Sequence, residues 1–242
     1  MAIVGSGLGS SLGLAAESAF GTFAAPTRWL EFLDEKFEWK PKITKGKALN
    51  GQLTPSLSQR VVTSSRIEGS MKTYLYENSM GLLFEQLFGT GSSTQNASTT
   101  SYTQAFSVGD VQGKSLSFQI NRPDLAKGDH AYSYSGMKLT GAKLMCGTDE
   151  YAEIDWTLIG QQVSYTQALT APTINVNNFP FSFVNASILA GTYGSEAVIA
   201  SVDKADIDFK RPFNSNRMPI GSNGLMNEPI RGSILNRILQ LP

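Results

Sequence analysis

Apolar and polar residues alternate along several stretches of this chain, and an alternation with a period of two predicts β-strands. The pattern is clearest at 116–121 and 152–158, where every second residue is apolar. Such strands bury one face and leave the other in solvent, as in antiparallel sheets. Further runs of strand type occupy 28–33, 36–40, 61–76, 132–145, 181–189 and 197–209. The sequence therefore predicts a mainly β protein, a β-sandwich or barrel.

One segment, at about 79–88, has the period of a helix instead. Apolar residues recur there at helical spacing, namely Met80, Leu83, Phe84 and Leu87. Asn78 or Ser79 can cap its start, and Gly89 can supply a left-handed residue at its end. A helix this apolar is expected to flank the sheet and pack against an open end or face of it.

Four segments lack either pattern. Residues 1–26 are rich in glycine and small side chains, which predicts an N-terminal arm that becomes ordered only against a partner. The stretch 40–60 mixes Pro and Gly with four lysines and predicts one long loop, a feature that is usually functional in compact domains. The polar run 91–101 predicts a mobile surface loop, and 210–242 a C-terminal arm. Residues 27–209 then form the β-domain.

Composition narrows the function classes. The 242 residues include 20 Lys and Arg and 20 Asp and Glu, so the net charge is zero and a dedicated nucleic-acid binder is not expected. Cys146 and His130 are single residues of their types, which excludes an internal disulfide and a multi-histidine metal site. With no long apolar run and no signal-peptide pattern, we expect a soluble protein made in a reducing cytoplasm, without a membrane partner.

Catalytic and cofactor motifs are not found. His130 lies in a turn, where a polar turn residue is a simpler interpretation than a catalytic one. The sequence Gly-Lys-Ser at 113–115 resembles the end of a phosphate-binding loop, but position 108 is Val and a strand follows. The acidic residues at 203–208 lack the glycine and glutamate of a calcium loop. We therefore expect neither an enzyme nor a cofactor.

Charge is distributed unevenly along the chain. The stretch 40–66 has six bases and no acid, whereas 144–203 has six acids and no base. Chance is one explanation, since weakly charged chains readily show such gaps. Self-association is the other, in which a basic loop on one copy meets an acidic surface on another.

Several stretches, taken in serial order, resemble the major tail tube proteins of bacteriophages with long, non-contractile tails. The likeness extends from residue 2 to about 230 and is carried by the stretches 5–28, 81–89, 102–106, 113–116, 122–124 and 134–138. The resemblance implies a structural virion protein. Each subunit would be a β-sandwich with a flanking helix, six subunits would form a ring, and stacked rings would form the tail tube that conducts DNA during ejection.

The resemblance also implies partners and a location. The chain would assemble with itself, with the tape-measure protein and with other tail proteins, and DNA would be in transit rather than specifically bound. Assembly would take place in the host cytoplasm. A barrel of about eight strands is filled by its own side chains, so a lumen for duplex DNA needs several subunits. Family members often continue through further strands after 227–230, so the C-terminal region is expected to be shortened or used differently.

Residues outside the β-domain are the candidates for contacts between subunits. They are Ile3, Leu8, Leu12, Phe20 and Phe23 in the arm, and Lys42, Lys45 and Lys47 in the long loop. The arm holds too much glycine to fold alone but is too apolar for a solvated tail, so removing it is expected to leave a folded subunit that does not assemble. The lysines are expected to act through charge complementarity.

Glu153 and Asp155 are candidates for the face that lines the lumen, because they lie opposite the apolar residues of their strand. A lumen with more acids than bases would let DNA slide, since each phosphate contact by Lys or Arg adds affinity. The 91–101 loop is expected to be dispensable. The alternative function is a carbohydrate- or receptor-binding β-sandwich module of a virion.

Overall fold

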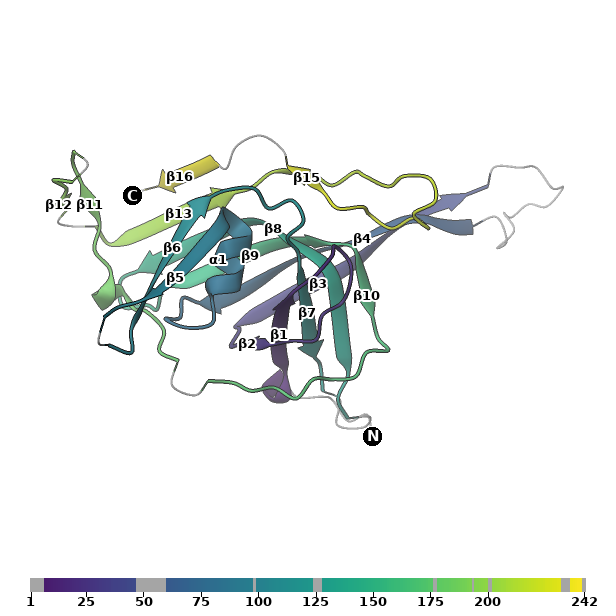
Figure 1. The fold of residues 1–242 in the computed structure, drawn as a ribbon, viewed down its shortest axis with the longest axis horizontal. Coiled ribbons are helices and arrows are strands. Elements are labelled where there is room, and N and C mark those ends of the chain that lie inside the picture. Colours follow the sequence, from purple (N-terminus) through teal and green to yellow (C-terminus); the bar gives the residue numbers. More distant parts are fainter. Residues whose placement is uncertain are drawn as a thin grey trace.

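The protein is a mainly β structure with one α-helix in its described part (Figure 1). The computed structural model describes residues 7–46, 60–97, 99–123, 128–175, 178–192, 194–199, 202–231 and 236–240; for Leu8 and 236–240 it describes the backbone alone. The predicted fold class is confirmed. Its strands are β1 (Ser11–Ala16), β2 (Arg28–Leu30), β3 (Asp34–Lys45), β4 (Arg60–Tyr74), β5 (Gly89–Gln95), β6 (Tyr102–Val108), β7 (Leu116–Asn121), β8 (Ala131–Gly147), β9 (Glu153–Gly160), β10 (Gln162–Ser164), β11 (Leu189–Ala190), β12 (Ala197–Val198), β13 (Lys204–Lys210), β14 (Phe213–Asn214), β15 (Ile230–Arg231) and β16 (Asn236–Gln240).

Ten of these strands form one antiparallel sheet, in the order β2-β1-β7-β8-β9-β4-β3, with β10 and β13 also paired to β8 and β16 paired to β13. The long strand β8 runs through the whole sheet and has different partners along its length. Its first half pairs with β7 and β10, and its second half pairs with β9 and β13. Its pairing with β9 is irregular between Leu139 and Gly141, and such bulges bend a strand. The sheet can therefore fold over into two packed layers.

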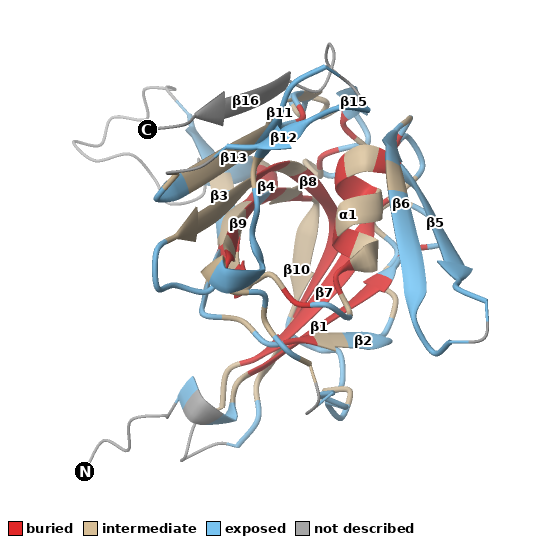
Figure 2. Cartoon of the chain, turned by 90° about the vertical axis from the view of Figure 1, so that its left-hand side faces the viewer, coloured by how far each residue is buried: buried red, intermediate tan, exposed pale blue. Residues whose placement is uncertain are grey.

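The core lies between the two layers, as the buried strands in Figure 2 show. Phe37 of β3 crosses the interior to contact Phe118 of β7 and Tyr134 of β8, with ring centroids 5.7 and 5.2 Å apart. The predicted half-buried strand is confirmed for β9. For β7 it is wrong, because all six residues are buried and the chain at Ala168 and Thr170 covers Gln119 on its polar face. The buried apolar side chains of β7 and β9 are Leu116, Phe118, Ile120, Ile154, Trp156 and Leu158.

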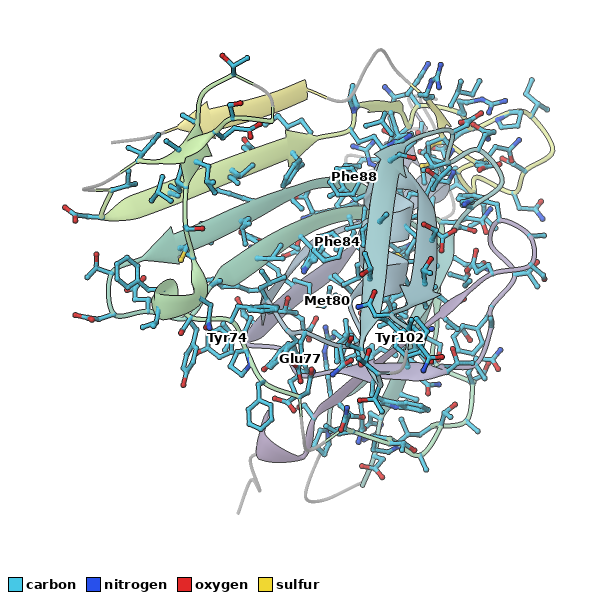
Figure 3. All side chains as sticks on the ribbon, turned by 60° about the vertical axis from the view of Figure 1, so that its left-hand side comes forward. Tyr74, Glu77, Met80, Phe84, Phe88 and Tyr102 are labelled. Atoms are coloured by element: carbon cyan, nitrogen blue, oxygen red, sulfur yellow. The ribbon has the colours of Figure 1, made fainter. Side chains whose placement is uncertain are left out.

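The helix α1 (Gly81–Phe88) covers part of this interior (Figure 3). The rings of Phe84 and Phe88 pack edge-on against Trp156 and Phe209, each at a centroid distance of 5.4 Å. Gly89 follows the helix with a φ of 109°, as predicted. The predicted cap is wrong: the N-cap is Met80 and no side chain caps the helix, because the chain turns through a left-handed Ser79 before the helix begins.

The predicted N-terminal arm is wrong from residue 11 onward, since β1 is an interior strand of the sheet. It pairs with β7 through six residues and with β2 through three, and Leu12 and Leu14 are fully buried. Glycine serves close packing here rather than flexibility: a Cβ on Gly13 would lie 2.6 Å from Cβ of Pro26. Composition alone does not distinguish these two uses of glycine.

Glu17 anchors the segment that follows β1. Its buried carboxylate accepts hydrogen bonds from Gly21 N at 2.9 Å, Gly136 N at 2.8 Å, Ser115 Oγ at 2.5 Å and Ser117 Oγ at 2.7 Å. Four donors from three parts of the chain satisfy a charge that would otherwise be costly to bury. The turn after β1 is therefore part of the β-domain.

The predicted loop over 40–60 is also partly wrong. β3 continues to Lys45 and pairs with β4 back to Arg60, so these strands form a hairpin whose tip, 47–59, lies outside the described residues. Pro41 obscured the strand pattern in the sequence. Proline is accepted because β3 is an edge strand, where the missing N–H breaks no ladder bond.

The polar run 91–101 is not an unstructured loop either, because β5 and β6 form a two-stranded hairpin in register from Gly89–Val108 to Gln95–Tyr102. Its side chains are polar since most of both strands is exposed. Phe106 anchors it to α1, with ring centroids 5.5 Å from Phe84 and 6.4 Å from Phe88.

Shortening this hairpin should therefore have two different results. Replacing 96–101 with a two-residue Asn-Gly turn keeps every strand pair and should change the free energy of unfolding by less than about 1 kcal/mol. Replacing 91–100 removes the strand opposite Phe106 and should lower the melting temperature clearly. Thermal denaturation followed by circular dichroism compares the two variants, and equal melting temperatures would contradict the assigned register.

The region after β13 folds back onto the domain, so the predicted boundary at 209 is not a domain boundary. Arg211 is buried and donates to Leu87 O and Gly109 O at 2.5 Å each, and Met226 is fully buried. Glu228 pairs with Lys138 at 2.6 Å. A buried lysine on β8 thus binds the C-terminal segment to the sheet.

Candidate assembly surfaces

The β3–β4 hairpin projects past the body of the molecule, to the right in Figure 1. Its apolar face continues the buried face of the sheet, because Trp39 is opposite Ile67 and Ile43 is opposite Val62. Beyond the body this face is uncovered: Trp39 is 48% exposed and Ile43 is 56% exposed. An apolar strip of this kind is typical of interaction surfaces.

The same hairpin carries bases without acidic partners. Lys42, Lys45 and Arg60 are exposed, and none of them forms an ion pair within the described residues. By contrast, Lys40 pairs with Glu38 and Arg66 pairs with Glu68 nearer the body. The end of the hairpin is therefore both apolar and positively charged.

The residues predicted to contact other subunits lie in different places in the structure. Lys42 and Lys45 lie on this projecting hairpin, where another copy can reach them. Ile3, Lys47 and the side chain of Leu8 lie outside the described residues. The assignment of Leu12 is wrong, because its side chain is fully buried between the layers of its own chain. Phe20 and Phe23 are half-buried in the turn after β1.

Sequence reasoning missed the apolar side chains of the hairpin: Trp39, Ile43, Val61 and Val62. A signal was present, since apolar and basic residues alternate from Trp39 to Ile43, with Pro41 at one of the apolar positions. That alternation is the pattern of a strand with one apolar face.

A second surface is the outer face of strands β13, β8, β9, β4 and β3, on which most side chains are charged. It carries acids and bases in similar numbers, namely Asp34, Glu38, Glu68, Glu153, Asp155, Asp206 and Asp208 with Lys36, Lys40, Lys42, Arg66, Lys72, Lys143, Lys204 and Lys210. Most pair across or along the strands. The contacts include Lys72–Glu153 at 2.6 Å, Lys210–Asp208 at 2.8 Å and Lys143–Asp206 at 3.0 Å.

Glu153 and Asp155 lie on this charged face, opposite the buried side of β9 as their alternation predicted. This face as a whole carries no excess of acids, and the prediction that the lumen is acidic stays a prediction. Lys72 and Lys143 are the cross-strand neighbours of Asp155, so pairing brings bases beside the acids. Burial raises the pKa of Asp155, an effect that Lys72 opposes and Asp34 reinforces. One strand read alone cannot reveal these neighbours.

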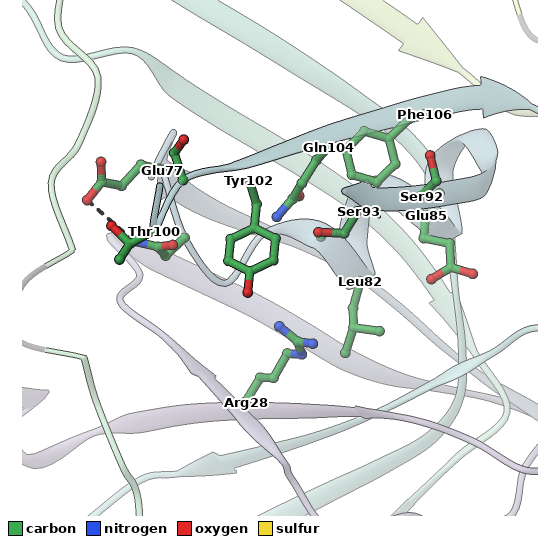
Figure 4. A pocket seen from close by; sticks show the side chains of 14 residues that line it. Arg28, Glu77, Leu82, Glu85, Ser92, Ser93, Thr100, Tyr102, Gln104 and Phe106 are labelled. Atoms are coloured by element: carbon green, nitrogen blue, oxygen red, sulfur yellow. Dashed lines mark hydrogen bonds between the residues drawn. The ribbon is translucent and has the colours of Figure 1, made fainter. Parts of the chain in front are cut away.

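A pocket of about 740 Å³ lies between β2, α1 and the β5–β6 hairpin (Figure 4). Arg28, Glu77, Glu85 and the exposed Tyr102 line it. Glu85 is already paired with Lys114 at 2.7 Å. The lining holds neither His nor Cys, so it provides no activated nucleophile of the Ser-His or Cys-His type.

Two further features are absent from the described residues. No group of three or more His, Cys, Asp or Glu is close enough to bind a metal ion. In the same part of the chain, no helix has the length and hydropathy needed to cross a bilayer.

Comparison with protein families gives a decisive match. The model of the phage tail tube protein family aligns with residues 7–227, nearly the whole chain. The chain belongs to the phage tail tube protein family. A search of curated proteins finds no match. The resemblance stated from the sequence is confirmed: tail tube proteins are structural proteins of the virion tail and assemble with copies of themselves into a tube.

Membership in the tail tube family suggests a role for the exposed surfaces, which is contact between subunits. A tail tube subunit must contact copies of itself, and the projecting hairpin offers apolar area and unpaired charge for such a contact. Over the body of the subunit the charged outer face offers less of either, because ion pairs already satisfy most of its charges there. The two surfaces are therefore suited to different roles in a tube.

Proposed function

We propose that six copies of this chain form a ring, and that rings stack into the tail tube through which DNA is ejected. The observation that carries this proposal is the β3–β4 hairpin, whose exposed apolar face and unpaired bases lie outside the body of the subunit. Burying Trp39 and Ile43 against another copy would remove apolar area from water and favour association. The tape-measure protein, other tail proteins and assembly in the host cytoplasm belong to the same proposal.

The charged outer face of the sheet is the surface that we propose for the lumen. Tight DNA binding requires bases that displace counterions from phosphates, whereas most bases on this face are held by neighbouring acids. DNA would pass without being held. Several subunits must contribute, because the interior of this one chain is filled by its own core.

The first residues of the chain are a further candidate contact. We propose that Ile3 and Leu8, with the half-buried Phe20 and Phe23, touch a neighbouring subunit next to β1. The family match favours the tube over the alternative of a carbohydrate- or receptor-binding module. Negative-stain microscopy distinguishes the two, because only the first interpretation produces rings or tubes.

Charge reversal on the hairpin tests whether the hairpin takes part in ring stacking. The variant Lys42→Glu/Lys45→Glu should abolish tubes and keep a native circular dichroism spectrum, since like charges across an interface are strongly unfavourable. Lys36→Glu/Lys210→Glu is the matched control, with the same net charge change at exposed positions on the outer face. Tubes formed by the hairpin variant at the parent's level, in low and moderate salt, would contradict the proposal.

A further inference from the structure

The molecule has a second apolar end, opposite the hairpin. β4 runs from Arg60 at the hairpin to Tyr74, a length of roughly 50 Å at about 3.3 Å per residue. At the Tyr74 end, Phe181 contacts both Leu75, which follows β4, and Ala152, which precedes β9. Phe181 N donates to Leu75 O, and Ala152 N donates to Phe181 O, both at 2.8 Å.

Large apolar side chains are exposed at this end. Phe179 is 69% exposed and Val184 is 87% exposed, and Phe181 and Tyr151 are also exposed. Tyr74 packs beside Tyr151 with ring centroids 5.2 Å apart. None of these five belongs to the fully buried core. We call this surface, made of Tyr151, Phe179, Phe181 and Val184, the acceptor end.

The charge of the acceptor end is opposite to that of the hairpin. Glu77, Asp149 and Glu150 lie beside these aromatic residues: Glu77 N donates to Phe179 O, and Phe183 N donates to Glu150 O. All three acids are exposed, and none forms an ion pair within the described residues. Two of the nearby bases are already engaged, Lys72 by Glu153 and Lys204 by Asp206, while Arg28 lines the same pocket as Glu77. The acceptor end is thus apolar and negatively charged.

We infer that the acceptor end binds the β3–β4 hairpin of a second copy of this chain. The inference rests on the proposed tube and names the surface that the hairpin meets. Apolar area would meet apolar area, and Lys42, Lys45 and Arg60 would meet Glu77, Asp149 and Glu150. A contact of one hairpin with another would instead bring like charges together.

The geometry of this contact also suits an open filament. Donor and acceptor lie at opposite ends of β4, so the contact is head-to-tail. A head-to-tail contact leaves a free hairpin at one end of every assembly and a free acceptor at the other, and it can therefore repeat without limit. The hairpin of each copy would reach the copy stacked on it.

A charge swap between the two ends tests the inference. One variant, Lys42→Glu/Lys45→Glu, makes both ends acidic; the other, Glu77→Lys/Glu150→Lys, makes both ends basic. Asp149 is left unchanged because its φ of 62° favours Asp over Lys. Each variant alone should yield at least about tenfold fewer tubes than the parent. Mixing the two should restore tubes, because each hairpin then meets an acceptor of opposite charge.

Two outcomes of the charge swap would overturn the inference. If Glu77→Lys/Glu150→Lys assembles as well as the parent, the acids of the acceptor end take no part in stacking. If both variants are blocked and the mixture is blocked as well, the hairpin binds a different surface. Lys36→Glu/Lys210→Glu assembles by itself and retains an acidic acceptor end. When it is mixed with Lys42→Glu/Lys45→Glu, the tubes that form should exclude the hairpin variant.

A cross-link separates this inference from the proposed tube. In a Cys146→Ser background, one protein carries Ile43→Cys and the other Val184→Cys, and mild oxidation should join them into a heterodimer on a non-reducing gel. Ile43→Cys mixed with Val108→Cys, an exposed apolar position at the end of β6, is the matched control and should give much less heterodimer. If the heterodimer forms but no sample contains tubes, the contact between hairpin and acceptor end is supported and the proposed tube is contradicted. Absence of the selective heterodimer would overturn the inference, whether or not tubes form.

Discussion

A variant lacking residues 1–17 is expected to be unfolded, with no cooperative thermal transition and no native circular dichroism spectrum. The deletion removes β1, which pairs with β7 through six residues, and leaves that strand with an open edge beside the core. It also removes Leu12 and Leu14, both fully buried, and truncation of one buried Leu to Ala alone costs about 2–5 kcal/mol. The loss exceeds what a typical domain can withstand, since total stabilities are about 5–15 kcal/mol.

Removing only residues 1–6 is the control for this deletion, because β1 and its neighbours then remain in place. That shorter deletion should melt like the parent. The single substitution Leu14→Ala should fall between the two, folded but less stable. A cooperative transition in the variant lacking 1–17 would contradict the assignment of β1 to the sheet.

Lys138→Met is expected to lower the free energy of unfolding by about 3–5 kcal/mol. The Lys138 ammonium is 0% exposed and is held by Val111 O at 2.8 Å and by Glu228 at 2.6 Å. Removing it leaves the Glu228 carboxylate without its cation and releases the C-terminal segment from β8. Chemical denaturation measures the loss. The double variant Lys138→Met/Glu228→Gln should recover part of it, because neither charge is then left unpaired.

The stability contributed by this pair should depend on pH in a defined direction. Burial alone would raise the pKa of Glu228, but hydrogen bonds from Lys138 and Gly113 outweigh it and hold the pKa below its ordinary value. A carboxyl with a lowered pKa stabilises the fold above its ordinary pKa, and the contribution is lost as pH falls through the lowered value. Glu228→Gln should therefore flatten the acid side of the stability curve.

The exposed pair Lys72–Glu153 offers a matched control for the buried one. Its atoms are 2.6 Å apart, as in Lys138–Glu228, but both side chains are substantially exposed. Lys72→Met should change stability by less than about 1 kcal/mol, because solvent screens the pair. Equal losses for Lys72→Met and Lys138→Met would show that burial does not decide the effect.

The sequence alone determined those features that one strand or one helix shows by itself. Alternation at 116–121 and 152–158 places the same side chains inward as the structure does, because the two faces of a strand are set by its own period of two. The helical spacing ahead of Gly89 likewise identified α1. The serial order of motifs identified the tail tube family, since that match needs no knowledge of contacts.

Only the tertiary structure decided how these elements are used. The glycine and serine residues near the N-terminus predicted a flexible segment. In the structure β1 is an interior strand, because Gly13 allows Pro26 to approach closely and β7 forms hydrogen bonds with it. The sequence of β9 alone predicted an acidic face. The pairing of β9 with β4 and β8 places Lys72 and Lys143 beside Asp155. Nothing in the sequence indicates that Lys138 is buried, because its partner Glu228 lies 90 residues away along the chain. Local pattern fixes which way a side chain points; long-range pairing decides what it meets there.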